Sequence, residues 1–279
     1  MMISLFSKTC AECSKLITNN YSTSFSLGIR VFASELRSPI YSIYGFVRFA
    51  DEIVDTFHDK DKKTLLEEFK SDTFKALERK VSFNPVLHAF QEVVHAYNIE
   101  YKHIEAFLKS MEMDLYDIEY DDETLKEYIY GSAEVIGLMC LKVFCKGDKE
   151  KYDALEPYAI SLGSAFQKIN FLRDMKSDFE ERGRVYFPGV DLSNFTQEDK
   201  ERIEDDIQKE FDHALIGIQR LPRGAKLGVY TAYRYYISLF YKIKEAQASN
   251  ILTKRIRINN GKKMYLLTSS AFKNKFGLL

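Results

Sequence analysis

Tryptophan is absent from this chain of 279 residues, and proline and glycine are scarce, with 5 and 13 copies. Because those two residues most often interrupt regular structure, their scarcity argues against a loop-rich or low-complexity protein. Hydrophobic residues make up 46% of the chain, which is enough for a sizeable core. The aromatic residues are 21 Phe and 18 Tyr, which suit either a large core or a pocket for a long hydrocarbon.

The chain also lacks an excess of charge of either sign, since 40 Lys and Arg balance 41 Asp and Glu and the net charge is −1. Nucleic-acid-binding proteins usually carry a basic excess, so no nucleic-acid partner is expected. The first 20 residues lack the apolar stretch of a signal peptide, and no run reaches the ~18 apolar residues of a membrane span. The sequence therefore predicts a cytoplasmic protein.

Cysteines are few, and Cys10 and Cys13 form a single C-x-x-C pair. A zinc site usually needs a second pair or histidines at suitable spacing, and none follows. We therefore expect reduced thiols that bind no metal. The five histidines stand at no ligand spacing, which favours surface positions or hydrogen-bonded core positions.

Apolar residues recur at intervals of three and four, the spacing of one helix face. They do so between Ser38 and Phe57, where Ser38 followed by Pro39 is typical of a helix start. Further helices are expected at 65–77, 84–97, 101–117, 123–145, 150–180, 197–219 and 223–250. Strand signals are nearly absent, and no repeat or linker is visible. The chain is therefore predicted to be all-α, with a single domain over residues 1–279.

The first acidic segment carries Asp51 and Asp55 at the end of an expected helix. At ~100° per residue their carboxylates lie about 40° apart on one face, which Tyr44 and Arg48 share. Carboxylates so close repel each other unless a cation lies between them. Mg²⁺ commonly takes one or two carboxylates together with substrate phosphates, so this face is a candidate magnesium site.

The second acidic segment places a column of polar side chains on one helix face. Its members are Gln167, Asn170, Asp174 and Asp178. Ile169 and Leu172 between them are apolar, and an unpaired carboxylate in apolar surroundings is costly. One D-x-x-x-D pair alone is usually a solvated helix face. Two such segments, each with an arginine, instead predict two acidic helices that hold several Mg²⁺ around a diphosphate.

The chemistry expected of such a site is the ionisation of a diphosphate. Mg²⁺ neutralises the leaving group as a Lewis acid, and arginines bind phosphate oxygens through two parallel hydrogen bonds. The allylic cation left behind needs a dry apolar cavity, and Tyr and Phe rings can stabilise it through their faces. The residues alone thus predict magnesium-dependent diphosphate ionisation in a helical bundle.

These segments resemble the squalene/phytoene synthase family over nearly the whole chain. The matching stretches are Tyr21-Ser22-Thr23-Ser24-Phe25-Ser26, then Ser42-Ile43-Tyr44 with Arg48, Asp51 and Asp55, then Tyr130-Gly131-Ser132-Ala133-Glu134-Val135-Ile136-Gly137, then Asn170-Phe171-Leu172-Arg173-Asp174 with Asp178, and finally Arg182-Gly183-Arg184-Val185-Tyr186-Phe187-Pro188. Their joint occurrence is highly specific for that family.

The resemblance implies an isoprenoid-synthase helical bundle with a central apolar cavity. The metal ligands that it implies are Asp51, Asp55, Asn170, Asp174 and Asp178. The catalytic residues that it implies are Tyr44, Arg48, Asp51, Asp55, Tyr130, Asp174 and Asp178. The substrate-binding residues that it implies are Tyr21, Ser22, Thr23, Ser24, Tyr44, Arg48, Gln167, Arg173, Tyr186, Tyr236 and Arg255. Mg²⁺, several ions per site, is the expected cofactor with Mn²⁺ as a substitute, and NADPH is not expected.

In this family one isoprenoid diphosphate ionises and its C1 attacks the double bond of a second molecule. The resulting cyclopropyl diphosphate ionises, rearranges and loses a proton. The compact length and the stretch G-R-V-Y-F-P are most similar to bacterial carotenoid-pathway members, which implies that two geranylgeranyl diphosphates are joined to phytoene. The alternative is a C30 enzyme that makes squalene, dehydrosqualene or hydroxysqualene from farnesyl diphosphate.

Two further hypotheses concern partners. A non-catalytic helical scaffold or assembly factor would be expected to have lost its aspartates, and all four are intact. A basic cluster near the end of the chain is either solvated or touches anionic lipid on the inner face of a membrane. It consists of Lys254, Arg255, Arg257, Lys262 and Lys263.

Overall fold

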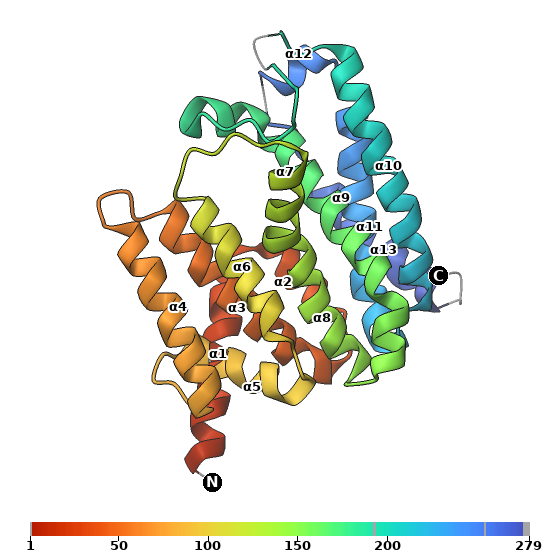
Figure 1. Cartoon of the computed structure of the whole chain (residues 1–279). Coiled ribbons are helices and arrows are strands. Elements are labelled where there is room, and N and C mark those ends of the chain that lie inside the picture. Colours follow the sequence, from red (N-terminus) through yellow and green to blue (C-terminus); the bar gives the residue numbers. More distant parts are fainter. Residues whose placement is uncertain (1, 192–193, 254, 276–279) are drawn as a thin grey trace.

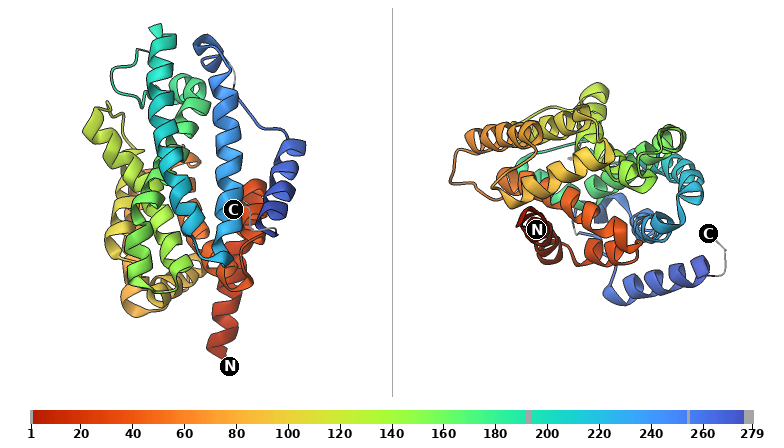
Figure 2. Two further views of the ribbon diagram at one scale, coloured as in Figure 1. Left: turned by 90° about the vertical axis from the view of Figure 1, so that its right-hand side faces the viewer. Right: turned by 90° about the horizontal axis from the view of Figure 1, so that it is seen from below.

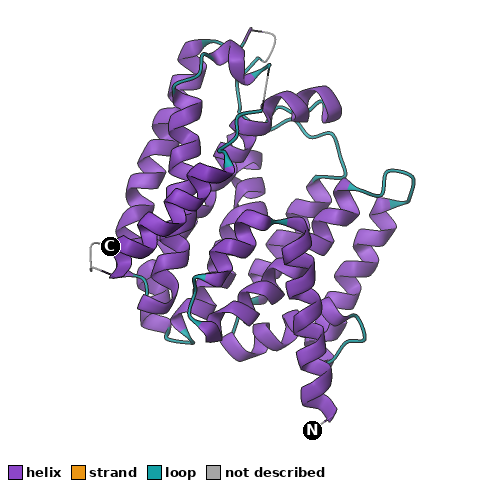
Figure 3. Ribbon diagram, turned by 180° about the vertical axis from the view of Figure 1, so that it is seen from behind, coloured by secondary structure: helices purple, strands orange, loops and turns teal. Residues whose placement is uncertain are grey.

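The computed structural model describes residues 2–191, 194–253 and 255–275, apart from the side chains of 2, 23–24, 181–182, 260 and 274–275. Its helices are α1 Met2–Tyr21, α2 Thr23–Arg30, α3 Ser34–Asp55, α4 Lys62–Arg79, α5 Pro85–Tyr97, α6 Tyr101–Met113, α7 Asp122–Ile129, the π-helical η1 Tyr130–Glu134, α8 Val135–Cys145, α9 Lys149–Arg182, α10 Gln197–Arg220, α11 Arg223–Lys244, α12 Ala248–Ile251 and α13 Asn260–Lys275. No strand occurs within the described ranges, and the all-α prediction is confirmed (Figure 3).

The helices lie in two groups, with α8 between them (Figure 1). On one side α1, α4, α5 and α6 surround α3, and on the other α9, α10, α11 and α13 lie side by side. Helix α8 contacts both α3 and α9, which joins the groups. Helix α13 lies on the outer side of α11 and stands away from the rest of the bundle (Figure 2).

Polar side chains cap the N-termini of several of these helices, close to the starts that the sequence predicted. Asn84 Oδ1 accepts hydrogen bonds from the backbone N–H groups of Val86 and Leu87, at 3.0 and 3.4 Å, and Pro85 follows as the first helical residue. Thr196 and Asp199 form a capping box at the start of α10. These caps satisfy N–H groups that have no partner within the helix, so the predicted starts near 84 and 197 are confirmed.

The predicted start of α3 at Ser38 is wrong, because the helix begins at Ser34 and contains Pro39. Tertiary contacts extend it: the N–H of Ala33 donates to the carbonyl of Gly224 at 2.9 Å, and Leu36 is buried. Packing therefore outweighs the backbone hydrogen bond that a proline cannot make. The sequence prediction also missed α1, α2 and α13.

One cluster of buried apolar side chains extends from Ile29 to Ile258 and connects the two groups of helices. The stretch 122–145, which comprises α7, η1 and α8, is long and apolar enough to cross a membrane, against the prediction that no stretch would be. Because 56% of it is buried inside the fold, it has the character of a core helix.

Candidate active site

The ends of three helices meet at the site. Asp51 lies in the last turn of α3, Asp174 lies towards the end of α9, and Asp114 caps the end of α6. Arg184, just beyond α9, approaches Asp114 with 2.6 Å between Nη1 and Oδ1. The charge of Asp114 in turn acts on Asp51. Through Asp114, the region just beyond the second acidic segment is thus linked to Asp51 of the first.

Asp51 is a carboxyl whose charge is poorly compensated. Burial raises its pKa to about 7, Arg48 opposes the rise, and the carboxylates of Asp55, Asp114 and Glu52 add to it. Arg48 comes only within 3.9 Å of Asp51, because its guanidinium lies closer to Glu52. Although 31% of the Asp51 side chain is accessible, the dense protein around it weakens the solvation of the charge. A cation beside Asp51 would hold it ionised.

The N-terminal segment predicted to bind substrate reaches the same face of α3. The Arg48 guanidinium lies 4.5 Å from the centre of the Tyr21 ring, and Tyr44 stacks on Phe25 with the ring centres 4.6 Å apart. Ser22 is the N-cap of α2, because its Oγ accepts a hydrogen bond from the backbone N–H of Phe25 at 3.2 Å. The Ser22 side chain also hydrogen-bonds with Tyr44. Burial raises the pKa of Tyr44, so its hydroxyl stays protonated at neutral pH. Two further predicted residues have side chains outside those described, namely Thr23 and Ser24.

The column predicted on α9 forms a chain of hydrogen bonds. Gln167 Nε2 donates to Ser132 Oγ at 3.2 Å, and Asn170 Nδ2 donates to Gln167 Oε1 at 3.3 Å. Tyr236 of α11 donates to Asn170 Oδ1 at 3.4 Å, and its ring stacks on Phe166. The structure thus places Tyr236, which the resemblance implies as a substrate-binding residue, against the second acidic helix.

Asp174, further along that column, lies between two arginines. Its carboxylate accepts from Arg173 Nε at 3.0 Å and Nη2 at 2.5 Å. Arg255, in the segment between α12 and α13, approaches the other side, with 2.6 Å between Nε and Oδ1 and 3.2 Å between Nη2 and Oδ2. The two arginines predicted to bind diphosphate therefore serve as counter-ions to a predicted metal ligand.

An aromatic group that the sequence prediction largely missed surrounds Asp114. Tyr128 donates to both of its carboxylate oxygens, at 2.9 and 3.1 Å. The rings of Tyr186, Tyr128 and Phe171 pack against one another, with the Tyr186 ring centre 5.6 Å from that of Tyr128 and 4.0 Å from that of Phe171. Burial raises the pKa of Tyr128, which keeps its hydroxyl a hydrogen-bond donor. Asp114 and Tyr128 thus join Arg184 and the predicted residue Tyr186 in one buried network.

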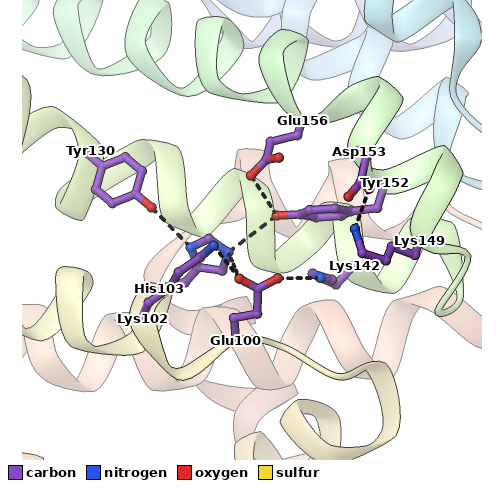
Figure 4. Close-up of polar contacts among 9 residues, drawn as sticks. All are labelled: Glu100, Lys102, His103, Tyr130, Lys142, Lys149, Tyr152, Asp153 and Glu156. Carbon is purple, nitrogen blue, oxygen red and sulfur yellow. Dashed lines mark hydrogen bonds and ion pairs between the residues drawn. The ribbon is translucent and has the colours of Figure 1, made fainter.

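The structure does not bring Tyr130 to this network, although the sequence placed it among the catalytic residues. Its hydroxyl lies 3.5 Å from His103 Nδ1, in a separate polar group with Glu100, Lys142 and Tyr152 (Figure 4). The physical reason is their spacing, because residues two apart on a helix point about 200° apart, and the side that presents Tyr128 to Asp114 therefore turns Tyr130 away. The tyrosine of this helix that reaches the acidic region is therefore Tyr128.

Asp178, at the end of the α9 column, borders a small hollow of about 10 Å³. Its lining combines that carboxylate and Arg184 with apolar side chains, among them Phe171, Tyr186 and Phe187. A hollow of that size has room for about one water molecule and does not by itself hold a substrate.

The donor set fits Mg²⁺ bound jointly with phosphate. Among the described residues, no three His, Cys, Asp or Glu side chains stand close enough to hold a metal by themselves. Mg²⁺ does not require that, since it commonly takes one or two carboxylates and completes its shell with phosphate oxygens and water. Asp51 and Asp55 on one side, and Asn170, Asp174 and Asp178 on the other, supply such oxygens. The raised pKa of Asp51 is what a carboxylate lacking its cation would have.

The remaining candidate residues are the cysteines and histidines. All four cysteines are free thiols, and burial, together with Cys13 and Glu92, raises the pKa of Cys10. His88 and His103 are buried and hydrogen-bonded. Burial lowers the pKa of His103 to about 4, so it is neutral at physiological pH.

Comparison with known proteins agrees with this geometry. The model of the squalene/phytoene synthase family matches residues 18–262. The chain belongs to the squalene/phytoene synthase family. Similar relatives include the 15-cis-phytoene synthase of Synechocystis, 27% identical over 92% of this chain and 82% of its own, and chloroplastic phytoene synthase 1 of Solanum lycopersicum, 26% identical over 95% and 68%. The 4,4'-diapophytoene synthase of Staphylococcus haemolyticus is 26% identical over 68% of this chain and 66% of its own.

Solved structures support the fold. A dehydrosqualene synthase superposes with a TM-score of 0.80 at 19% identity, covering 96% of this chain and 98% of its own. A squalene synthase from Alicyclobacillus acidocaldarius gives 0.70 at 19% identity, covering 85% and 94%. The isoprenoid-synthase helical fold is therefore confirmed. The chain spans from 65% to 68% of the length of four plant relatives and 90% of that of chloroplastic phytoene synthase 2 of Solanum lycopersicum.

Proposed function

We propose that this family member is a phytoene synthase, which joins two geranylgeranyl diphosphates head to head through a cyclopropyl diphosphate. The observation that carries the proposal is the link between the two acidic segments: Asp114, paired with Arg184 just beyond α9, acts on Asp51 of α3. The prenyltransferase family supports the reaction class, and the phytoene synthases among its relatives support the product. One synthase unit over residues 1–279 is part of this proposal.

Each group of residues has a distinct part in this mechanism. The aspartates and Asn170 would hold Mg²⁺, which would supply a Lewis acid to neutralise the leaving diphosphate. Arg48, Arg173 and Arg255 bind phosphate oxygens, for which the planar guanidinium is well suited. The ring faces of Tyr44 and Tyr186 stabilise the allylic cation, and the surrounding apolar side chains exclude water. The mechanism needs no reductant, so NADPH is not part of the proposal.

A C30 reaction is the second candidate. It is favoured by the TM-score of 0.80 with a dehydrosqualene synthase and by the diapophytoene synthase among the relatives. The two candidates differ in the length of prenyl chain that the interior accepts, and they share the acidic helices.

A product assay separates the candidates. Purified protein with Mg²⁺ is given farnesyl or geranylgeranyl diphosphate, with and without NADPH, and the hydrocarbon is identified. We expect phytoene from geranylgeranyl diphosphate, unchanged by NADPH. A C30 product with no C40 product would overturn the choice of phytoene and support the alternative.

Two substitutions test the metal ligands. Asp51→Asn and Asp174→Asn should each abolish turnover, because an amide cannot provide the anionic oxygen that Mg²⁺ prefers. Asp72→Asn, at an exposed position on α4, is the matched control and should leave turnover unchanged. Full activity of both site variants would contradict the metal assignment and favour a scaffold role that needs no chemistry.

A further inference from the structure

Asn170 differs from the other predicted metal ligands, all of them aspartates, because only one of its two terminal atoms can bind a cation. Either oxygen of an aspartate can serve as a ligand, whereas an asparagine binds through Oδ1, and its Nδ2 carries hydrogens that repel a cation. Turning the amide over would therefore remove the ligand without moving the rest of the side chain. Whatever fixes the orientation of this amide also fixes the ligand.

The Ser132 hydroxyl decides how the neighbouring amide of Gln167 is oriented. Its hydrogen is already used, because Ser132 Oγ donates to the backbone carbonyl of Tyr128 at 2.7 Å. For any other partner Ser132 Oγ is then an acceptor, and Gln167 Nε2 donates to it at 3.2 Å. The end of the Gln167 amide that remains for Asn170 is therefore the oxygen.

The orientation of Asn170 follows from that of Gln167. Because Gln167 offers Oε1, Asn170 meets it with Nδ2, which donates at 3.3 Å. Asn170 Oδ1 is then the other end, and it accepts from the Tyr236 hydroxyl at 3.4 Å. A carbonyl oxygen has two lone pairs, so this hydrogen bond leaves one for a cation.

The orientation is chosen at the Ser132 end of this chain of hydrogen bonds. A tyrosine hydroxyl such as that of Tyr236 can donate or accept, so it fits either orientation of the Asn170 amide. The backbone carbonyl of Tyr128 can only accept, so the Ser132 hydroxyl that donates to it fixes the direction of every later hydrogen bond.

Close packing of η1 on α9 lets so short a side chain as Ser132 reach Gln167. Gly163 stands one turn before Gln167, and a Cβ there would lie 2.8 Å from the Cα of Glu134. Glu134 belongs to the same π-helical turn as Ser132. The hydrogen bond between Ser132 and Gln167 is thus built into the packing of the two helices.

We propose that Ser132 is a positioning residue for the metal site, whose hydroxyl acts through Gln167 to hold the Asn170 amide with Oδ1 available to Mg²⁺. The inference rests on the proposed function, because Asn170 is a ligand only if the site binds Mg²⁺ with diphosphate. It deepens that function by adding a residue that sets the affinity for Mg²⁺ through two side-chain amides.

Ser132→Thr and Ser132→Val form the matched pair that tests this role, because the two variants have nearly the same shape and differ in the hydroxyl. Mg²⁺ is titrated by calorimetry into each protein in the presence of inorganic diphosphate. Ser132→Thr should bind Mg²⁺ as tightly as wild type, and Ser132→Val about fivefold more weakly, which is the contribution of one hydrogen bond. In Ser132→Val the Mg²⁺ concentration for half-maximal turnover should rise by the same factor, while kcat at saturating Mg²⁺ falls less.

Two further variants separate positioning from a purely structural role. Thr73→Val on α4 removes a buried hydroxyl that donates to the carbonyl of Phe69 at 2.8 Å, the same kind of bond that Ser132 makes to Tyr128. It should leave the affinity for Mg²⁺ unchanged. Gln167→Met removes the middle of the chain, so in that background Ser132→Thr and Ser132→Val should bind Mg²⁺ equally.

Equal affinity of Ser132→Thr and Ser132→Val for Mg²⁺ would overturn the proposal, as would a difference between them that persists beside Gln167→Met. Either result leaves the proposed function standing if the wild-type protein binds Mg²⁺ with diphosphate and forms phytoene. A wild-type protein that binds no Mg²⁺ in the presence of diphosphate would overturn the metal site and the role of Ser132 together.

Discussion

The pair formed by Asp114 and Arg184 should contribute strongly to stability, and a double-mutant cycle can measure its contribution. The two side chains are only 9% and 11% exposed. Removing one partner of a buried ion pair leaves the other uncompensated, which typically costs ~3–5 kcal/mol. Arg184 follows α9 and Asp114 ends α6, so this loss would also loosen the junction between the acidic helices.

The assay is urea unfolding of Asp114→Asn, Arg184→Gln and the double variant. Each single variant should lose about 3 kcal/mol of unfolding free energy, which corresponds to roughly 6–12 °C in Tm. The double variant should lose much less than the sum, because neither charge is then left unpaired. The exposed pair of Lys149 and Asp153, with side chains 80% and 51% accessible, serves as control and should show no resolvable coupling.

Additive losses in the Asp114 and Arg184 cycle would refute this reasoning. They would mean that each side chain acts through other partners, such as the Tyr128 hydroxyl on Asp114. Tyr128→Phe added to Asp114→Asn would then reveal that third contribution.

The remaining predictions concern single positions. Burial raises the pKa of Glu134 to about 7, so folding favours its protonated form and the free energy of unfolding falls as pH rises from 4.5 to 7. Glu134→Gln should therefore stabilise the protein above pH 7 by at most about 3 kcal/mol, and this gain in urea unfolding should vanish below pH 4.5. Tyr128→Phe should reduce turnover at least tenfold while Tyr130→Phe changes it less than twofold, and steady-state rates that reverse this order would contradict the assignment. Gly131→Ala should cost ~1–3 kcal/mol in urea unfolding, because its Cβ would lie 2.4 Å from the carbonyl oxygen of Ala106. Arg255→Gln should leave stability within ~1 kcal/mol and weaken binding of inorganic diphosphate with Mg²⁺ about tenfold by calorimetry.

The helices and the acidic columns could be predicted because they depend on local periodicity. The spacing of Asn170, Asp174 and Asp178 is a property of one helix, and the hydrogen-bond chain along α9 follows from it. The start of α3 could not be predicted in the same way. Ser38 and Pro39 favour a helix start, but contact with α11 extends the helix to Ser34.

The parts of the site that were missed depend on tertiary packing. Asp114 is one aspartate at a helix end, and no local pattern separates it from the aspartates of exposed loops. Tyr128 and Tyr130 stand two residues apart, so they point to nearly opposite sides of the helix, and only tertiary packing decides which of them faces Asp114. Gly131 likewise gives no local signal, because it is needed only where α6 comes so close.

The charges on the two acidic helices are balanced differently, and this difference gives an order to binding. Asp174 has two arginines within hydrogen-bonding distance, whereas Asp51 has one arginine that lies closer to Glu52. A cation that binds with diphosphate would therefore supply Asp51 with a counter-ion that the protein does not provide. At Asp174 the same cation would have to displace Arg255. That displacement costs little, since Arg255 is 48% exposed, and it frees a guanidinium for the incoming phosphate. Under the proposed mechanism, the same arginine pairs with the aspartate before the substrate arrives and binds the diphosphate afterwards.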